Sequence, residues 1–126
     1  MRNKKILVLL TSLMFFSSPV LVLAINRVSD EACRDRSDFL KLWNNQSGEA
    51  GGVCFAYAGA QDIRVNRVEV ITTGNNYAKF TADGRFYPSS TGYYCKFTTV
   101  RPENTNVWTR VSRVVIRAQV PSACKK

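Results

Sequence analysis

The sequence predicts an all-β fold in which two antiparallel sheets pack as a sandwich stapled by disulfides. Short runs rich in β-branched and aromatic residues alternate with clusters of Gly, Asn, Asp, Ser and Pro, which recur about every eight to twelve residues. The chain of 126 residues also contains four cysteines and no histidine. An even number of cysteines in a small exported domain is typical of a disulfide framework.

The first 24 residues have the pattern of a secretory signal peptide. A basic segment at residues 2–5 precedes the apolar stretch Ile6–Ala24, and its end, Val22-Leu23-Ala24, is typical of a cleavage site. An uncleaved membrane anchor is the alternative, because an apolar stretch of nineteen residues nearly spans a bilayer. We expect residues 1–24 to be removed, and residues 25–126 to form a single domain that is secreted to the extracellular space.

The exported domain is basic. Three of the eighteen basic residues lie in the signal segment, so fifteen basic and nine acidic residues remain, and the net charge is +6. This charge favours anionic partners such as wall polymers, phospholipid headgroups or the acidic face of another protein. Nucleic acid would also suit the charge, but a secreted protein is not expected to meet it. We therefore expect no nucleic-acid partner, and a monomer.

The elements expected in chain order are strands separated by turns. The strands are expected over residues 39–43, 53–58, 63–73, 77–80, 85–87, 93–100 and 107–120. The polar residues 44–52 form a hairpin loop, and turns are expected at 59–62, 74–76 and 88–92.

Three of these segments carry more specific signals. The apolar phase shifts within 63–73, which predicts a bulge or a break near Asn66-Arg67. Asp83-Gly84 is the signal of a tight hairpin. The last segment also fits helical spacing, but its β-branched residues and flanking turns favour a strand.

All four cysteines, Cys33, Cys54, Cys95 and Cys124, lie in the exported part. Four cysteines permit three pairings, and the sequence alone does not choose among them. We expect Cys33–Cys54 and Cys95–Cys124, which close two local loops of about twenty and about thirty residues, each contributing about 3 kcal/mol. A zinc site is disfavoured, because the chain has no CxxC pair and no histidine.

Enzymatic activity is not expected. Without histidine the chain cannot build a Ser-His-Asp or Cys-His arrangement, and the cysteines are expected in disulfides. Acidic residues cluster locally over residues 30–38, where Arg34 and Arg36 alternate with them, as in a solvated charged segment. Asp62 and Asp83 lie in expected turns.

Aromatic residues beside cations form the first set of candidate binding residues. Tyr87 and Tyr94 are the outward candidates, near Lys79 and Arg85. Exposed rings beside such cations suit stacking on sugars or insertion at a membrane interface. The alternative is that these rings fill the core of the sandwich.

Arginines of the last segment form the second set. Arg113 and Arg117 project from the same face of a strand and could bind phosphate or carboxylate groups. The alternative is an ordinary solvent-facing strand whose positive charges discourage edge pairing.

Three stretches of the chain resemble the secreted βγ-crystallin-type domains related to the Streptomyces killer-toxin-like protein. They are INRVSDEACRDRSDFLKLW at residues 25–43, CFAYAG at 54–59 and TTGNN at 72–76. The resemblance implies two packed sheets built from Greek-key units, in which Cys54 pairs with Cys33. It also implies a killer-toxin-like antimicrobial or antifungal protein, while a protein of similar fold inhibits metalloproteinases.

Many βγ-crystallin domains bind calcium through two adjacent Asn or Asp residues, two free positions, then Ser/Thr and Ser. Here Asn75 and Asn76 are followed by Tyr77-Ala78 and then by Lys79-Phe80. A lysine at an oxygen-ligand position repels Ca²⁺, which requires six to eight oxygens. The motif is therefore degenerate and we expect no cofactor, with a calcium-binding structural domain as a third hypothesis.

The leading hypothesis is a secreted, non-enzymatic binding protein, an antimicrobial or antifungal effector that acts on an anionic cell-envelope target. The alternative is an inhibitor or adaptor that docks on another extracellular protein such as a protease. Such an inhibitor requires a rigid exposed loop, and residues 46–52 and 101–106 are the candidates.

Overall fold

The computed structural model describes residues 24–44, 51–89 and 91–126. The expected signal peptide, apart from Ala24, and most of the expected loop over 44–52 lie outside the described residues. Within the described part of the chain, no helix has the length and apolar character needed to cross a membrane.

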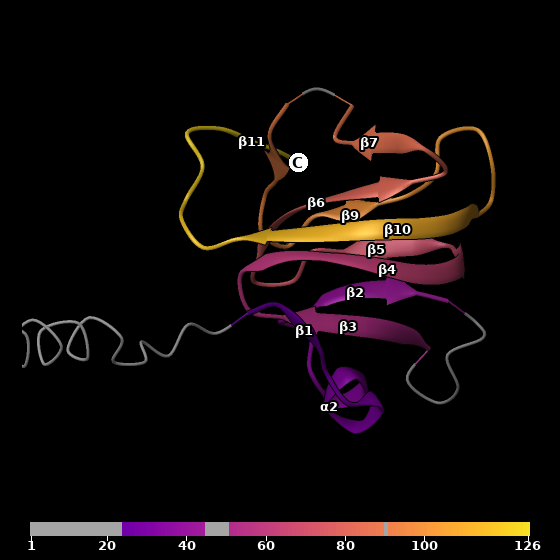
Figure 1. Ribbon diagram of the computed structural model, residues 1–126, viewed down its shortest axis with the longest axis horizontal. Coiled ribbons are helices and arrows are strands. Elements are labelled where there is room, and N and C mark those ends of the chain that lie inside the picture. The colour runs from indigo at the N-terminus through magenta and orange to yellow at the C-terminus, as the bar shows by residue number, and fades with distance from the viewer. Residues whose placement is uncertain (1–23, 45–50, 90) are drawn as a thin grey trace, which may run out of the picture.

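Two antiparallel sheets pack face to face, as predicted (Figure 1). The first sheet has the order β1 (Asn26–Arg27), β3 (Gly52–Ala56), β2 (Leu40–Trp43), β5 (Val70–Thr72) and β9 (Thr99–Val100). The second has the order β11 (Cys124–Lys125), β8 (Tyr93–Tyr94), β6 (Tyr77–Ala82), β10 (Trp108–Arg117) and β4 (Gly59–Val68), with β7 (Arg85–Tyr87) paired to β6. The β11–β8 pair is parallel.

The connections form two Greek-key units of four strands, β2 to β5 and β6, β7, β9 and β10. In each unit three strands lie in one sheet, and the third strand along the chain lies in the opposite sheet. In the first unit β3, β2 and β5 are neighbours in the first sheet, while β4 lies in the second. In the second unit β7, β6 and β10 are neighbours in the second sheet, while β9 lies in the first. The short strand β8 is inserted between β7 and β9. This arrangement is a two-sheet Greek-key sandwich of βγ-crystallin type.

Two segments that the sequence predicted as single strands are each divided between the sheets. Residues 63–73 divide at Glu69, after Arg67 takes a left-handed conformation with φ of 55°. The predicted break near Asn66-Arg67 is therefore a crossover from β4 to β5. Residues 93–100 divide in the same way into β8 and β9, with Phe97 at φ of 56°.

The chain reverses earlier than expected after β3. Residues 59–62, expected as a turn, are the first part of β4, so that prediction is wrong. The reversal takes place at Tyr57, whose φ is 70°. Gly59, at φ of 139°, packs so closely on Ile25 that a side chain would lie 3.1 Å from its Cγ2.

A short helix that the sequence analysis missed lies against β3 on the outer side of the first sheet. α2 (Asp30–Asp35) begins after Ser29, whose Oγ accepts a hydrogen bond from Ala32 N at 3.3 Å. Asp30 and Glu31 stand in the first turn, where negative charge is favourable. The serine followed by two acidic residues was the available signal. Its charged residues are solvated, as expected, but Cys33 is buried and anchors the helix to β3.

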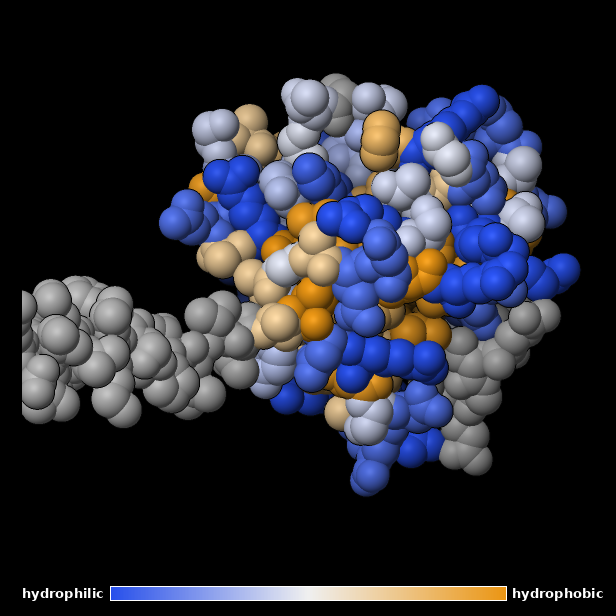
Figure 2. All heavy atoms as spheres, viewed as in Figure 1, coloured by the Kyte–Doolittle hydropathy of each residue, from blue (hydrophilic) through white to orange (hydrophobic). Residues whose placement is uncertain are grey.

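The main core lies between the sheets. Its largest fully buried side chains include Leu40, Leu42 and Phe55 of the first sheet and Trp108 of the second. Phe80 packs edge-on against Trp108, with 5.3 Å between the ring centroids. Figure 2 shows hydrophobic residues exposed in patches between hydrophilic ones on the face in view.

A second, smaller core lies on the outer side of the first sheet. Cys54 alternates with Phe55 along β3, so its side chain faces α2 and not the main core. There it forms a disulfide with Cys33, and Val28 and Phe39 pack against the pair. The other disulfide joins Cys95, after β8, to Cys124 of β11. Both are the pairs that the sequence analysis expected.

The junction between the two Greek-key units, which we call the Thr73–Asn76 junction, is held by a dense set of hydrogen bonds. The buried Thr73 Oγ1 donates to Cys95 O at 2.8 Å and accepts from Thr98 N at 2.9 Å. Asn76 Nδ2 donates to Asp38 O and to Thr73 O, both at 2.9 Å. The junction thus binds the segment before β2 and the segment between β8 and β9.

Gly74 is predicted to be irreplaceable at this junction. Its φ is +59°, and an added Cβ would lie 2.6 Å from the Asp38 carbonyl group and nearer still to Phe39 O. Gly84 is a matched control, because its φ is +75° but nothing lies within 4 Å of an added Cβ. We expect Gly84→Ala to lower the free energy of unfolding by about 1–2 kcal/mol, and Gly74→Ala to lower it by clearly more. Urea denaturation measures both, and equal losses would contradict the steric argument.

Cys54 is predicted to act only as a covalent staple. Cys54→Ser opens the bridge and should lower the free energy of unfolding by about 3 kcal/mol. In the unreduced native protein a maleimide reagent should label none of the four cysteines. Labelling of native Cys54 before reduction would contradict this role.

Candidate functional site

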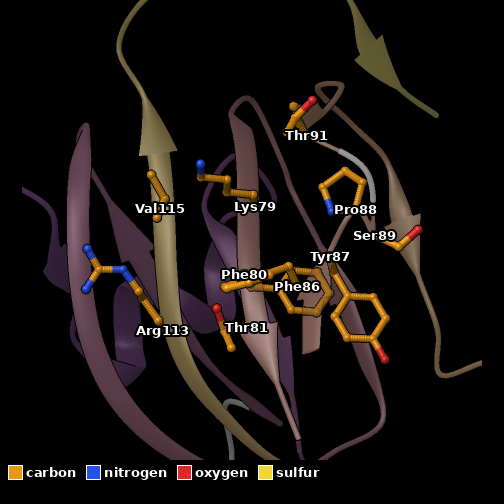
Figure 3. Close-up of a pocket in the computed structure, with 11 residues that line it drawn as sticks. Lys79, Phe80, Thr81, Phe86, Tyr87, Pro88, Ser89, Thr91, Arg113 and Val115 are labelled. Carbon is orange, nitrogen blue, oxygen red and sulfur yellow. The ribbon is translucent and has the colours of Figure 1, made fainter. Parts of the chain in front are cut away.

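The candidate site is a groove of about 330 Å³ on the outer face of the second sheet, which we call the β6–β10 groove (Figure 3). β6 and β10 pair with Lys79 opposite Val115 and Thr81 opposite Arg113. These four side chains alternate with core residues along their strands and therefore point outward. The lining is completed by Phe80, Phe86, Tyr87, Pro88, Ser89, Thr91 and Gly92.

Phe86 is the most exposed aromatic ring of this groove, with 74% of its surface accessible. The tight turn at Asp83-Gly84 pairs Thr81 with Phe86 and Phe80 with Tyr87. Because Phe80 points into the core, Tyr87 points inward as well, and Phe86 points out. The sequence analysis chose Tyr87 as the outward ring, although the hairpin register could have identified Phe86.

Tyr87 lies at the boundary between the β6–β10 groove and the main core. It is half-buried and stacks on Phe80, with 5.0 Å between centroids and 8° between the ring planes. It also meets Trp108 edge-on at 5.5 Å. Its ring therefore forms part of the groove wall and at the same time closes the core.

The prediction that Tyr94 faces outward is wrong. Only 6% of its surface is accessible, and its ring packs against Phe80 at 5.9 Å between centroids. Burial raises the pKa of the Tyr94 phenol above its ordinary value. Its neighbour Tyr93 is the more exposed of the two and lies between cations: Lys79 Nζ is 4.8 Å and Arg117 Cζ 5.3 Å from its ring centroid.

Of the four cationic residues that the sequence analysis chose, the structure brings only two together in the groove. Lys79 and Arg113 line the groove as diagonal neighbours on β6 and β10, and Arg117 lies beside Tyr93. Arg85 is exposed at the hairpin turn, opposite Ala82, and does not line the groove.

Arg113 is already oriented by a carboxylate. Its Nη1 donates to Asp62 Oδ1 of β4 at 2.6 Å, and both side chains are exposed. An exposed ion pair contributes about 0–1 kcal/mol, so an anionic ligand can replace Asp62 at little cost. No acidic side chain stands among the described residues that line the groove.

Asn75 and Asn76, the remnant of the calcium motif, lie at the Thr73–Asn76 junction and not in the groove. The Asn76 amide holds two carbonyl oxygens, while Asn75 contributes its backbone N–H, which donates to Asp38 O at 2.9 Å. Among the described residues, no three His, Cys, Asp or Glu side chains are grouped as a metal site. The TTGNN stretch thus has an observed structural role.

Asn76→Asp tests whether this turn is structural or calcium-binding. The change removes the donor and places a carboxylate against two carbonyl oxygens, so we expect a loss of about 2 kcal/mol or more in unfolding free energy. Asn75→Asp, at the exposed neighbouring position, is the control and should lose much less. Thermal midpoints in calcium and in chelator should agree for the native protein and for both variants. A rise with calcium would overturn this expectation.

Comparison with known proteins bears on the fold. No protein-family model matches the chain, and no curated protein matches it. Among solved structures, the chain is similar to the NMR structure of an antifungal protein from Streptomyces tendae Tu901. The two share 22% sequence identity with a TM-score of 0.51, over 73% of this chain and 98% of that chain. At this identity the likeness shows the fold, a disulfide-stapled two-sheet Greek-key sandwich of βγ-crystallin type.

Proposed function

We propose that this chain is an exported, non-enzymatic binding protein that acts as an antimicrobial or antifungal effector on an anionic component of the cell envelope. The observation that carries the proposal is the β6–β10 groove. There Lys79 and Arg113 stand beside the exposed ring of Phe86, on a face formed by rigid, paired strands.

The chemistry of the groove suits a ligand with an anionic group attached to a ring or an acyl surface. Arg113 presents a planar fork for a carboxylate or phosphate, and Lys79 adds a point charge. Phe86 supplies an exposed apolar ring. Because this side chain has few rotatable bonds, it loses little conformational entropy when a ligand packs on it. The net charge of +6 on residues 25–126 attracts polyanionic surfaces over a longer range.

The carboxylates near the groove have structural partners, which supports binding without catalysis. Asp83 accepts the backbone N–H groups of Thr109 and Arg110 at 3.0 and 2.9 Å. Asp62 accepts from Arg113. Two disulfides in a small domain support export, and the name of the antifungal protein of similar fold supports the role.

Co-sedimentation with isolated microbial cell envelopes tests the proposal. We expect the native protein to sediment with them, and Lys79→Gln and Arg113→Gln each to weaken binding about tenfold or more, because a hydrogen bond to a charged group contributes about 1.5–3 kcal/mol. Phe86→Ser should weaken binding without changing the thermal midpoint, since Phe86 is exposed.

Arg101→Gln is the matched control, because it removes an equal charge from the exposed segment between β9 and β10. If Arg101→Gln weakens binding as much as Arg113→Gln, the groove is not the binding site. If the protein ignores envelopes and forms a tight 1:1 complex with a soluble secreted protein such as a protease, the inhibitor or adaptor function is the correct one.

A further inference from the structure

A second groove, of about 440 Å³, lies on the outer face of the first sheet. It extends from the C-terminal end of α2, across β2 and β5, to β9, so it shares no residue with the β6–β10 groove. We call it the Lys41 groove. The lining residues that matter for ligand binding are Lys41, Trp43, Phe97, Thr98 and Thr99.

Lys41 is the unusual residue of this groove. Leu40 and Leu42 of β2 point into the core, so Lys41 points outward, yet only 7% of its surface is accessible. Gly52 of β3 makes room for its aliphatic chain, because a Cβ there would lie 2.9 Å from Lys41 Cε. The ammonium Nζ comes to rest 3.7 Å from the centroid of the Trp43 ring.

The Lys41 ammonium lacks an oxygen partner within the described part of the chain. It takes part in no ion pair or hydrogen bond there, and it lies over the Trp43 ring. The nitrogen is not one of the described polar atoms that are both fully buried and without a partner, so the aliphatic chain is buried while the ammonium reaches solvent in the groove. Burial of the side chain lowers the pKa of Lys41. An anionic group entering the groove would meet this ammonium directly.

The rest of the lining offers aromatic surface, together with two arginines that already lie beside carboxylates, Arg36 being held by both oxygens of Asp38. Trp43 is 39% accessible, and its indole is oriented by a hydrogen bond from Nε1 to Thr72 Oγ1 at 3.0 Å. Phe97 is 72% accessible on the same groove. Arg34 and Arg36 lie at the α2 end together with Asp35, whose Oδ1 is 4.0 Å from Arg34 Nε.

We propose that the Lys41 groove binds a carboxylate-bearing sugar of the uronic acid class. Its carboxylate would meet the Lys41 ammonium, its ring would lie against Trp43 or Phe97, and its hydroxyl groups would face Thr98 and Thr99. Two exposed rings beside the Lys41 ammonium favour this ligand over a simple anion, which would use the charge and leave the rings unused.

Isothermal titration of the disulfide-bonded protein with short oligogalacturonates tests the site. The methyl-esterified oligomer keeps the ring and loses the charge, while inorganic phosphate keeps a charge and loses the ring. We expect measurable binding of the acid, and at least tenfold weaker binding of both the ester and phosphate. These comparisons use the native protein and do not depend on how any variant folds.

Variants then locate the binding. Lys41→Met keeps the aliphatic chain and removes the charge, so the protein should stay folded and lose at least tenfold in affinity for the acid. Arg113→Gln, in the β6–β10 groove, should leave that affinity unchanged. No binding of the acid, equal binding of the ester or of phosphate, an unchanged affinity of Lys41→Met, or a loss with Arg113→Gln would each overturn the proposal. None of these results depends on whether envelopes bind the other groove.

Discussion

The fold depends on the Thr73–Asn76 junction, where the two Greek-key units meet. The Thr73 hydroxyl and the Asn76 amide together satisfy backbone groups of two distant segments, the one before β2 and the one between β8 and β9. Buried backbone groups require partners, and at a sheet-to-sheet crossing the strand ladders cannot supply them. Gly74 permits the close approach to residues 38 and 39 that these contacts require. The TTGNN stretch, which resembled the remnant of a metal site in the sequence, thus forms the hydrogen-bonded junction between the two Greek-key units.

The two outer faces differ because the sheets are covered differently. The outer side of the first sheet is covered at one end by α2 and the Cys33–Cys54 bridge, so β3 is buried on both sides. Beyond that cover, Lys41 and Trp43 border the Lys41 groove. The outer side of the second sheet carries Lys79, Arg113 and Phe86 in the other groove. Both grooves place cations beside aromatic rings on paired strands, a combination suited to anionic ligands.

Most strands and the Asp83-Gly84 hairpin could be predicted from the sequence, because alternation and turn chemistry are local. The two disulfide pairs were expected from the short loops that they close, and the structure confirms them, although the sequence alone permits three pairings. The segments over 63–73 and 93–100 were predicted as continuous strands, since a crossover between sheets leaves the same β-rich composition on both sides. Three residues that line the β6–β10 groove, Lys79, Tyr87 and Arg113, were among the candidate binding residues chosen from the sequence. Lys41 could not be chosen, because nothing local marks a strand lysine as buried.

By itself the sequence determined the all-β class, the positions of most strands and the residues that share a face of each of them. Only the tertiary structure decided which of those faces is covered. Alternation with a period of two assigns Tyr93 and Tyr94 to opposite faces, but packing against Phe80 placed Tyr94 inside. In the same way, the register of β7 on β6 turned Phe86 outward, and Gly52 on the neighbouring strand let Lys41 lie flat and become buried. Burial depends on what packs from elsewhere in the chain, and local sequence does not contain that information.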